Sequence, residues 1–252
     1  ARARWPFVCT WDDHEFTNNS WQSQSTYTRE GEPAEQRKVA ANQAWFEYIP
    51  AMLSNLQGPG DEVEPSRDFV FVDVENTHAE PFEDDPNNRA AINSLTLYRR
   101  LRFGKHVDLI MTDCRSYRSD HAVPEELSAR IGGRDTAMLP VEVVNLLDAG
   151  RTANSGNAPA KFTLRGREHD NPRVDSPAGT VLGDEQKAWF KKVLRESNAT
   201  WKVWGNSIPT MPLRLDLYDI EPPLENSVLS ADSWGGYPGE RTELMNYVKD
   251  EG

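Results

Sequence analysis

The sequence is poor in cysteine, in basic residues and in long apolar runs. Its 252 residues include two cysteines, Cys9 and Cys114. Spacing alone cannot bring these two together, so we favour buried free thiols over a disulfide. No apolar run approaches the roughly eighteen residues of a membrane-spanning helix, and we expect no transmembrane segment. The chain opens on Ala-Arg-Ala-Arg, which does not resemble a signal peptide.

Basic residues are outnumbered by acidic ones. Forty Asp and Glu against twenty-eight Lys and Arg give a formal net charge of −12. This charge opposes non-specific binding to nucleic acid or to an anionic membrane face, so we expect no nucleic-acid-binding surface. An acidic protein that binds an anionic ligand must create positive potential locally, with metal ions or a few arginines. Composition does not shift sharply along the chain, and we expect one domain.

Four ionisable side chains in a row, the acidic tetrad Asp12–Glu15, lie within Thr-Trp-Asp-Asp-His-Glu-Phe-Thr-Asn-Asn. The tetrad follows the apolar run Trp5–Cys9, which we expect to form a short buried strand. Carboxylates and an imidazole crowded at a strand end repel one another unless a cation or an anionic substrate completes the set. The pattern therefore predicts a divalent or trivalent metal. A solvated turn, with an aspartate as a helix cap and no role for the histidine, is the alternative.

A second polar cluster follows the continuous apolar run Val107–Thr112, which predicts a strand. In open α/β sheets, ligands bind beyond the carboxyl ends of the strands. The residues after this strand, Asp-Cys-Arg-Ser-Tyr-Arg, thus place Arg115, Tyr117 and Arg118 where phosphate oxygens can be bound. An ordinary salt bridge between Arg115 and a tetrad carboxylate explains the position of Arg115 equally well.

The remaining chain predicts a mixed α/β fold. Helical signals cover about 33–48, 140–149, 183–196 and 239–249, and strand signals cover 69–74, 97–103 and 201–204. In the first helix we expect a core face of Ala41, Ala44, Trp45 and Tyr48. The acidic loop 75–88 predicts a solvated face, with a peripheral calcium site as the alternative. Residues 127–181 have the composition of an insertion that shapes access to a cleft.

Five motifs together resemble a known family. The first is Trp-Asp-Asp-His-Glu at 11–15 with Asn18-Asn19. The others are Asp-Cys-Arg-Ser-Tyr-Arg at 113–118, Leu-Gly-Asp-Glu-Gln-Lys-Ala-Trp at 182–189, Trp-Lys-Val-Trp-Gly-Asn at 201–206 and Asp-Ser-Trp-Gly-Gly-Tyr at 232–237. In this order they resemble the PhoD-like alkaline phosphatases and phosphodiesterases of the metallophosphoesterase superfamily. Cys114 replaces the family's usual Thr, which puts the shape of that turn in question.

The resemblance implies part of a metallophosphoesterase-type β-sandwich flanked by helices. The family has a metal-ligand motif before the tetrad strand and a Gly-Asp-x-His after the last helix, and this sequence contains neither. We therefore expect residues 1–252 to be the central portion of a PhoD-like metallophosphatase domain, without the first and last ligand-bearing strands. Alone, this portion is expected to bind metal poorly, and its activity on its own stays open.

The implied function of the complete enzyme is metal-dependent hydrolysis of phosphate mono- or diesters, outside the cell or in the periplasm. The implied cofactors are calcium and ferric iron. By this resemblance Asp13, then Asp12, would bind metal, His14 would contact the phosphoryl oxygens or protonate the leaving alkoxide, and Arg115 would hold the phosphate. Lower-ranked substrate-binding candidates are Asn18, Asn19, Tyr117, Arg118 and Asn206. The alternatives are a phospholipase D-like phosphodiesterase and a non-catalytic, acidic, secreted calcium-binding domain.

Overall fold

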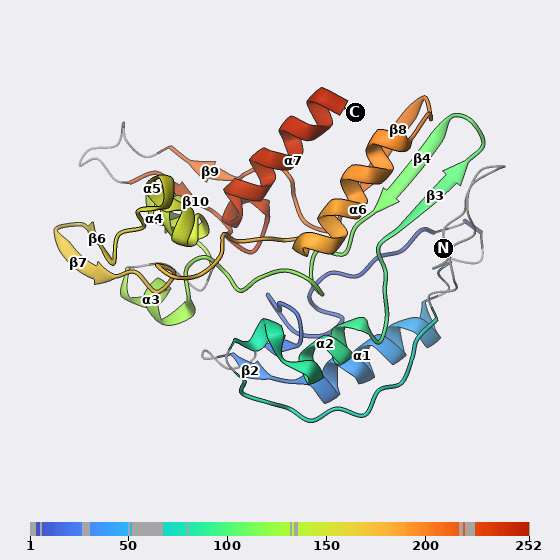
Figure 1. Ribbon diagram of the computed structural model, residues 1–252, viewed down its shortest axis with the longest axis horizontal. Coiled ribbons are helices and arrows are strands. Elements are labelled where there is room, and N and C mark those ends of the chain that lie inside the picture. Colours follow the sequence, from blue (N-terminus) through green and yellow to red (C-terminus); the bar gives the residue numbers. More distant parts are fainter. Residues whose placement is uncertain are drawn as a thin grey trace. The chain divides into compact units, whose positions relative to one another are not determined.

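The chain forms two compact units. The computed structural model describes residues 4–5, 7–26, 31–49, 51, 68–79, 81–131, 133, 136–216, 219 and 225–251. Unit 1 comprises residues 1–118, 182–207 and 248–252, and unit 2 comprises 119–181 and 208–247. Helices and short strands occur in both units (Figure 1), which confirms the predicted α/β class. Every predicted site residue lies in unit 1.

The sheet of unit 1 has the strand order β3-β4-β8. Strand β3 (Arg99–Phe103) is antiparallel to β4 (Val107–Met111), and β8 (Trp201–Gly205) is parallel to β4. Helix α6 (Gly183–Glu196) packs on this sheet, with the rings of Phe190 and Trp204 4.6 Å apart between centroids (Figure 1). These three strands and the helix were predicted from the sequence. Because β4 ends at Met111, the polar loop that follows begins at the carboxyl edge of the sheet.

Strand β8 is less buried than predicted. Trp201 is 67% exposed and Val203 is also exposed. The strand lies at an edge of the described sheet, and successive side chains on a strand point to opposite faces. Trp204 therefore packs against α6, whereas Trp201 and Val203 lie on the other face.

Helix α1 (Glu35–Tyr48) forms where predicted, but a different face is buried. Tyr48 is 75% exposed and Ala44 is exposed as well, so the predicted core face is wrong apart from Trp45. The buried residues are Glu35, Lys38, Val39, Asn42 and Trp45. These buried positions have the same helical spacing as the predicted face of Ala41, Ala44, Trp45 and Tyr48. Polar residues at the buried positions have partners: Asn42 donates to the carbonyl oxygen of Ala91 (3.1 Å), and Glu35 accepts from Thr77 (3.0 Å).

The acidic loop predicted at 75–88 contains the start of an unpredicted helix. A short 3-10 turn, η1 (Phe82–Asp84), leads into α2 (Pro86–Asn93), which packs against α1. Asp85 caps α2, accepting the backbone N–H groups of Asn87 (2.7 Å) and Asn88 (3.0 Å). Burial acts to raise the pKa of Asp85, but these hydrogen bonds outweigh it and lower the pKa. Asp84 forms a salt bridge with Arg89 of α2 (2.6 Å). Both Asp84 and Asp85 therefore contact the first half of this helix.

Two predicted strands do not form within the described residues. Neither 7–9 nor 69–74 enters a β-ladder, and both expose apolar side chains, of which Phe71 is 70% exposed. An extended segment becomes a strand only when another strand offers the complementary hydrogen bonds. Residues 69–74 instead run along α1 and α2, where Val74 packs with Val39 and Ala91. A small ladder of β1 (Gln24–Ser25) and β2 (Glu32–Pro33) completes the strands of unit 1.

Unit 2 is built around helix α4 (Val141–Asp148), which confirms the prediction at 140–149. Beside it lie the sheet β5-β10-β9 and the core residues Leu127, Val144, Leu147 and Val228. The strands are β5 (Leu139–Pro140), β9 (Arg214–Leu215), β10 (Ser227–Val228) and the hairpin β6 (Lys161–Leu164) with β7 (Arg167–Asp170). The other helical elements are α3 (Glu125–Arg130), η2 (Gly150–Thr152), α5 (Ala153–Gly156), η3 (Trp234–Gly236) and α7 (Pro238–Glu251), most of which belongs to this unit.

Two further expectations can be compared with the structure. Cys9 and Cys114 are both free thiols, as favoured from the sequence. Among the helices of the described residues, none is both long enough and apolar enough to cross a membrane.

Candidate functional site

The tetrad forms a tight turn that Asp13 holds together. Its Oδ1 accepts the backbone N–H of His14 (3.0 Å), and its Oδ2 accepts that of Asn19 (2.8 Å). The carbonyl oxygen of Asp13 also accepts the N–H groups of Phe16 and Thr17. The Asp13 side chain is nearly buried and caps its own turn. No helix begins at this turn, all of whose residues the structure describes, so the helix cap of the alternative interpretation does not form.

His14 points to solvent from this turn. Its side chain is 78% exposed, and its Nε2 lies 3.1 Å from Oδ1 of Asn18 and 3.8 Å from Oδ2 of Asp13. The imidazole is thus accessible to a ligand while the Asn18 side chain restricts its orientation. This accessibility meets the first requirement for a proton donor.

Arg115 lies against the tetrad although 103 positions separate it from Asp12. Its Nε and Nη2 each lie 2.8 Å from Oδ1 of Asp12, and its Nη1 donates to the carbonyl oxygen of Ser20 (3.4 Å). The Arg115 side chain is 3% exposed, whereas that of Asp12 is 42% exposed. Arg115 therefore forms the salt bridge to a tetrad carboxylate that was one of its two expected roles. Its contact with phosphate stays a prediction.

Helix α6 fixes the loop that carries Arg115. Gln186 of this helix accepts the backbone N–H of Asp113 (2.7 Å) and donates to its carbonyl oxygen (2.8 Å). The Asp113 carboxylate then caps the loop, because its Oδ1 accepts the N–H groups of Arg115 (2.9 Å) and Ser116 (3.0 Å). Within the described residues its Oδ2 has no hydrogen-bond partner, although the residue is completely buried.

Gln22 joins the two loops. Its backbone N–H donates to the carbonyl oxygen of Arg115 (2.9 Å), and its side-chain amide donates to that of Arg118 (3.0 Å). Asn88 of α2 in turn donates to Oε1 of Gln22 (2.5 Å). Through Asn88, near its start, the unpredicted helix α2 therefore holds the Gln22 side chain that joins the two loops.

The remaining predicted substrate-binding residues have other neighbours. Tyr117 packs edge-to-face on Tyr98, with centroids 5.6 Å apart, and the Arg118 side chain is fully buried. Oδ1 of Asn206 accepts the thiol of Cys114 (2.8 Å) at the end of β8. Burial, and next the charge of Asp113, raises the pKa of the Cys114 thiol to about 11, so it remains protonated as the donor. The structure thus unites Asp12, Asp13, His14, Asn18, Asn19 and Arg115, whereas Tyr117 packs against Tyr98 and the Arg118 side chain is buried.

Similarity to known proteins identifies the family of this chain. The family model of PhoD-like phosphatases matches residues 1–252, the whole chain. The chain belongs to this family. It is 25% identical over 251 residues to alkaline phosphatase D of Bacillus subtilis (strain 168), covering 100% of this chain and 30% of that relative. It also matches a solved structure of PhoD with a TM-score of 0.53 and 22% identity, over 98% of this chain and 32% of the other. The chain therefore spans less than a third of the length of either relative.

One residue near the tetrad was not predicted. Lys38 of α1 is 2% exposed, and its Nζ lies 4.3 Å from the ring centroid of Trp11 and 5.3 Å from that of Phe16. Burial lowers the pKa of Lys38 to about 8; the negative charges of Asp113 and Glu15 oppose this and that of Arg115 adds to it. The sequence signal for Lys38 is the helical spacing of Glu35, Lys38, Val39, Asn42 and Trp45 in α1.

The described residues do not form a complete metal centre. They contain no group of three or more His, Cys, Asp and Glu side chains placed to hold a metal ion. Asp13 uses both oxygens in its turn, and Asp12 is bound to Arg115. The calcium or iron expected from the resemblance thus lacks sufficient donors here, and we assign no chemical step to a metal.

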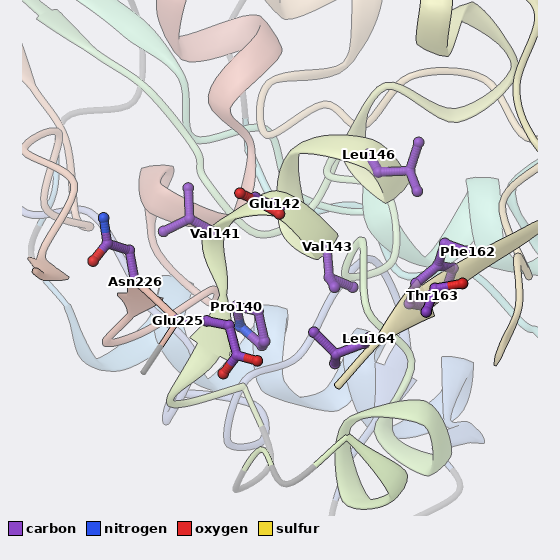
Figure 2. Close-up of a pocket in the computed structure, with 10 residues that line it drawn as sticks. All are labelled: Pro140, Val141, Glu142, Val143, Leu146, Phe162, Thr163, Leu164, Glu225 and Asn226. Atoms are coloured by element: carbon purple, nitrogen blue, oxygen red, sulfur yellow. The ribbon is translucent and has the colours of Figure 1, made fainter. Parts of the chain in front are cut away.

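A cavity of about 330 Å³ lies in unit 2 (Figure 2). Apolar side chains dominate its wall, with the carboxylates of Glu142 and Glu225 among them, and Glu225 is paired with Arg165 (3.0 Å). The predicted site residues do not line this cavity.

Proposed function

We propose that this protein hydrolyses phosphate esters at the tetrad and the loop after β4. The observation that supports the proposal is the pairing of Arg115 with Asp12, because it joins a buried guanidinium to the same turn that carries the exposed imidazole of His14, in a chain of the PhoD-like phosphatase family. An acidic protein needs such local positive charge to accept an anionic ester. Arg115 presents planar N–H donors, which suit phosphate oxygens.

In the proposed reaction His14 is the general acid. Water attacks phosphorus, the ester P–O bond breaks, the proton on Nε2 moves to the leaving alkoxide, and the water loses a proton to solvent. In the free protein Oδ1 of Asn18, 3.1 Å from Nε2, accepts a hydrogen bond from this proton when the ring is protonated, and the leaving oxygen would take the place of Asn18 before the transfer. Arg115 would bind a phosphoryl oxygen by exchanging part of its contact with Asp12.

Metal dependence belongs to the proposal as well. We propose Asp13 as the first metal ligand and Asp12 as the second, with calcium or ferric iron as the ion. A bound ion would lower the pKa of water and neutralise phosphoryl charge. Such a centre needs donors beyond those that the described residues bring together. We further propose a metallophosphoesterase-type sandwich for the whole protein and an extracellular or periplasmic location.

The test is the substitution His14→Ala in the full-length protein. We expect turnover of bis-(4-nitrophenyl) phosphate to fall on the order of a hundredfold, because positioned proton transfer contributes about that much. Since His14 is largely exposed, the unfolding temperature should not change. His78→Ala, which removes an exposed histidine from the segment after residue 74, is the matched control. Equal turnover in the two variants would remove His14 from the mechanism.

The same assay separates the two kinds of ester. Turnover of 4-nitrophenyl phosphate, a monoester, and of the diester should be measured side by side in the unmodified protein. Higher kcat/KM for the diester would support the phosphodiesterase reading. No hydrolysis of either compound, with and without added calcium and ferric iron, would contradict the proposed function.

A further inference from the structure

Lys38 places a positive charge in an unusual position. Its ammonium group is enclosed by the ring faces of Trp11 and Phe16, which flank the tetrad on its two sides in the sequence. Both aromatic side chains are buried. A cation over an aromatic face is attracted by the ring, and the attraction increases when water is excluded. Through these rings Lys38 contacts both ends of the turn that holds Asp12, Asp13 and His14.

This burial is costly for an ammonium group. Lysine is a strongly hydrated cation, and moving it out of water disfavours its charged form. The lowered pKa of about 8, caused first by burial, expresses that cost. A methionine would occupy similar space without this cost. Strained or costly groups of this kind occur preferentially at functional sites.

The charges around Lys38 are those of the candidate site. Asp113, Arg115 and Glu15 act on it electrostatically, and all three belong to the tetrad or to the loop after β4. Asp113 carries a buried carboxylate oxygen without a hydrogen bond among the described residues. The site therefore contains two buried cations, Arg115 and Lys38, that approach it from different elements.

We propose that Lys38 is a positioning residue for the phosphate-ester site. Its ammonium group fixes the tetrad turn through Trp11 and Phe16 and, with Arg115, supplies positive potential toward an anionic ester. The inference rests on the proposed function, since it assigns Lys38 to the same site. It differs from a packing role in that it requires the charge and not only the volume of the side chain.

The experiment compares Lys38→Met and Lys38→Arg with Lys192→Met in the full-length protein. Lys192 is an exposed lysine on α6, so its replacement makes the same change in net charge away from the site. The readouts are kcat and KM for bis-(4-nitrophenyl) phosphate, the inhibition constant of inorganic phosphate, and the unfolding temperature. For Lys38→Met we expect KM and the inhibition constant to rise about tenfold, with an unfolding temperature equal to or above that of the unmodified protein. Lys38→Arg, which keeps charge and ring stacking, should recover at least half of the loss on a logarithmic scale.

The outcomes separate the two proposals. If the unmodified protein hydrolyses the ester and Lys38→Met behaves like Lys192→Met, the inference is wrong while the proposed function stands. If Lys38→Met loses phosphate affinity only in proportion to a lowered unfolding temperature, or Lys38→Arg recovers nothing, the role is structural and the inference is again wrong. If the unmodified protein neither hydrolyses the ester nor binds phosphate, the proposed function itself is contradicted.

Discussion

At the scale of single residues, Asn19 shows how a predicted site residue can have a backbone role. Its φ of 54° lies in the left-handed region, which Asn and Gly adopt more readily than other residues. Its backbone N–H donates to Asp13, and this bond closes the tetrad turn. The sequence interpretation assigned Asn19 to substrate binding through its amide. Backbone conformation and amide chemistry therefore compete as explanations of this asparagine.

The two roles predict different results for two substitutions. Asn19→Gly keeps the left-handed backbone and removes the amide, whereas Asn19→Ala removes both. If the backbone is decisive, Asn19→Ala should lower the free energy of unfolding by about 1 kcal/mol and reduce turnover, and Asn19→Gly should remain close to the unmodified protein. Urea unfolding and ester turnover measure this. An equally large loss of turnover in both variants, without loss of stability, would instead establish the amide as a ligand of the substrate.

At the scale of elements, the site depends on a helix that holds the backbone of its second loop. Gln186 of α6 binds the N–H and the carbonyl oxygen of Asp113, and Asp113 in turn binds the N–H of Arg115. The motif at 182–189 thus serves the motif at 113–118. This chain of contacts explains why a scaffold helix carries a glutamine at a completely buried position.

Replacing Gln186 with leucine should damage both stability and turnover. The change leaves the buried N–H of Asp113 without its acceptor, which costs about 1–3 kcal/mol, and it releases the loop that orients Arg115. We expect urea unfolding to show this loss and ester turnover to fall at least tenfold, about the effect of a misplaced contact. Gln43→Leu, an exposed glutamine on α1, is the control and should change neither quantity. A Gln186→Leu protein with normal turnover would show that α6 does not position Arg115.

The sequence predicted those elements whose signals are local. Helices α4 and α6 and strands β3 and β4 follow from periodicity and end signals within their own residues. The strands expected at 5–9 and 69–74 failed because pairing depends on a partner that a local pattern does not contain. Helix α2 was missed because its acidic approach was assigned to a loop, although Asp85-Pro86 is a typical helix start.

The candidate site shows the same difference between local sequence signals and contacts with distant parts of the chain. A salt bridge between Arg115 and a carboxylate of the tetrad was one of the two accounts of Arg115 that the sequence left open, and the structure shows this bridge with Asp12. Lys38 could not be predicted in this way, since its burial depends on which of two equally spaced faces of α1 turns inward. That choice is made by the packing of α2 and of residues 69–74, which lies beyond the pattern of α1 itself.

At the scale of the whole molecule, the chain is strongly acidic and buries some of its carboxylates in both units. In unit 2, Asp148 at the end of α4 accepts the backbone N–H of Gly239 (2.9 Å) at the start of α7. Among the described residues its Oδ1 has no hydrogen-bond partner. Burial raises the pKa of Asp148 from 3.8 to about 7; the charge of Glu240 adds to this, and the bond from Gly239 opposes it.

This raised pKa predicts that unit 2 is less stable at high pH. A group that binds its proton more tightly in the folded than in the unfolded state stabilises the fold below its unfolded pKa and loses that contribution as pH rises to the folded value. The free energy of unfolding should therefore fall between pH 4 and 7 and level off above pH 7, by on the order of 4 kcal/mol for this group.

Asp148→Asn isolates this contribution. The amide keeps an oxygen for the N–H of Gly239 and cannot ionise, so the variant should match the unmodified protein near pH 4 and exceed its stability at pH 8. Urea unfolding at several pH values gives the difference between the two proteins, in which the titration of all other groups cancels. Asp170→Asn, which removes an exposed carboxylate from the β6–β7 hairpin of the same unit, should show a difference that stays flat with pH. A flat difference for Asp148→Asn as well would mean that folding does not raise the pKa of Asp148.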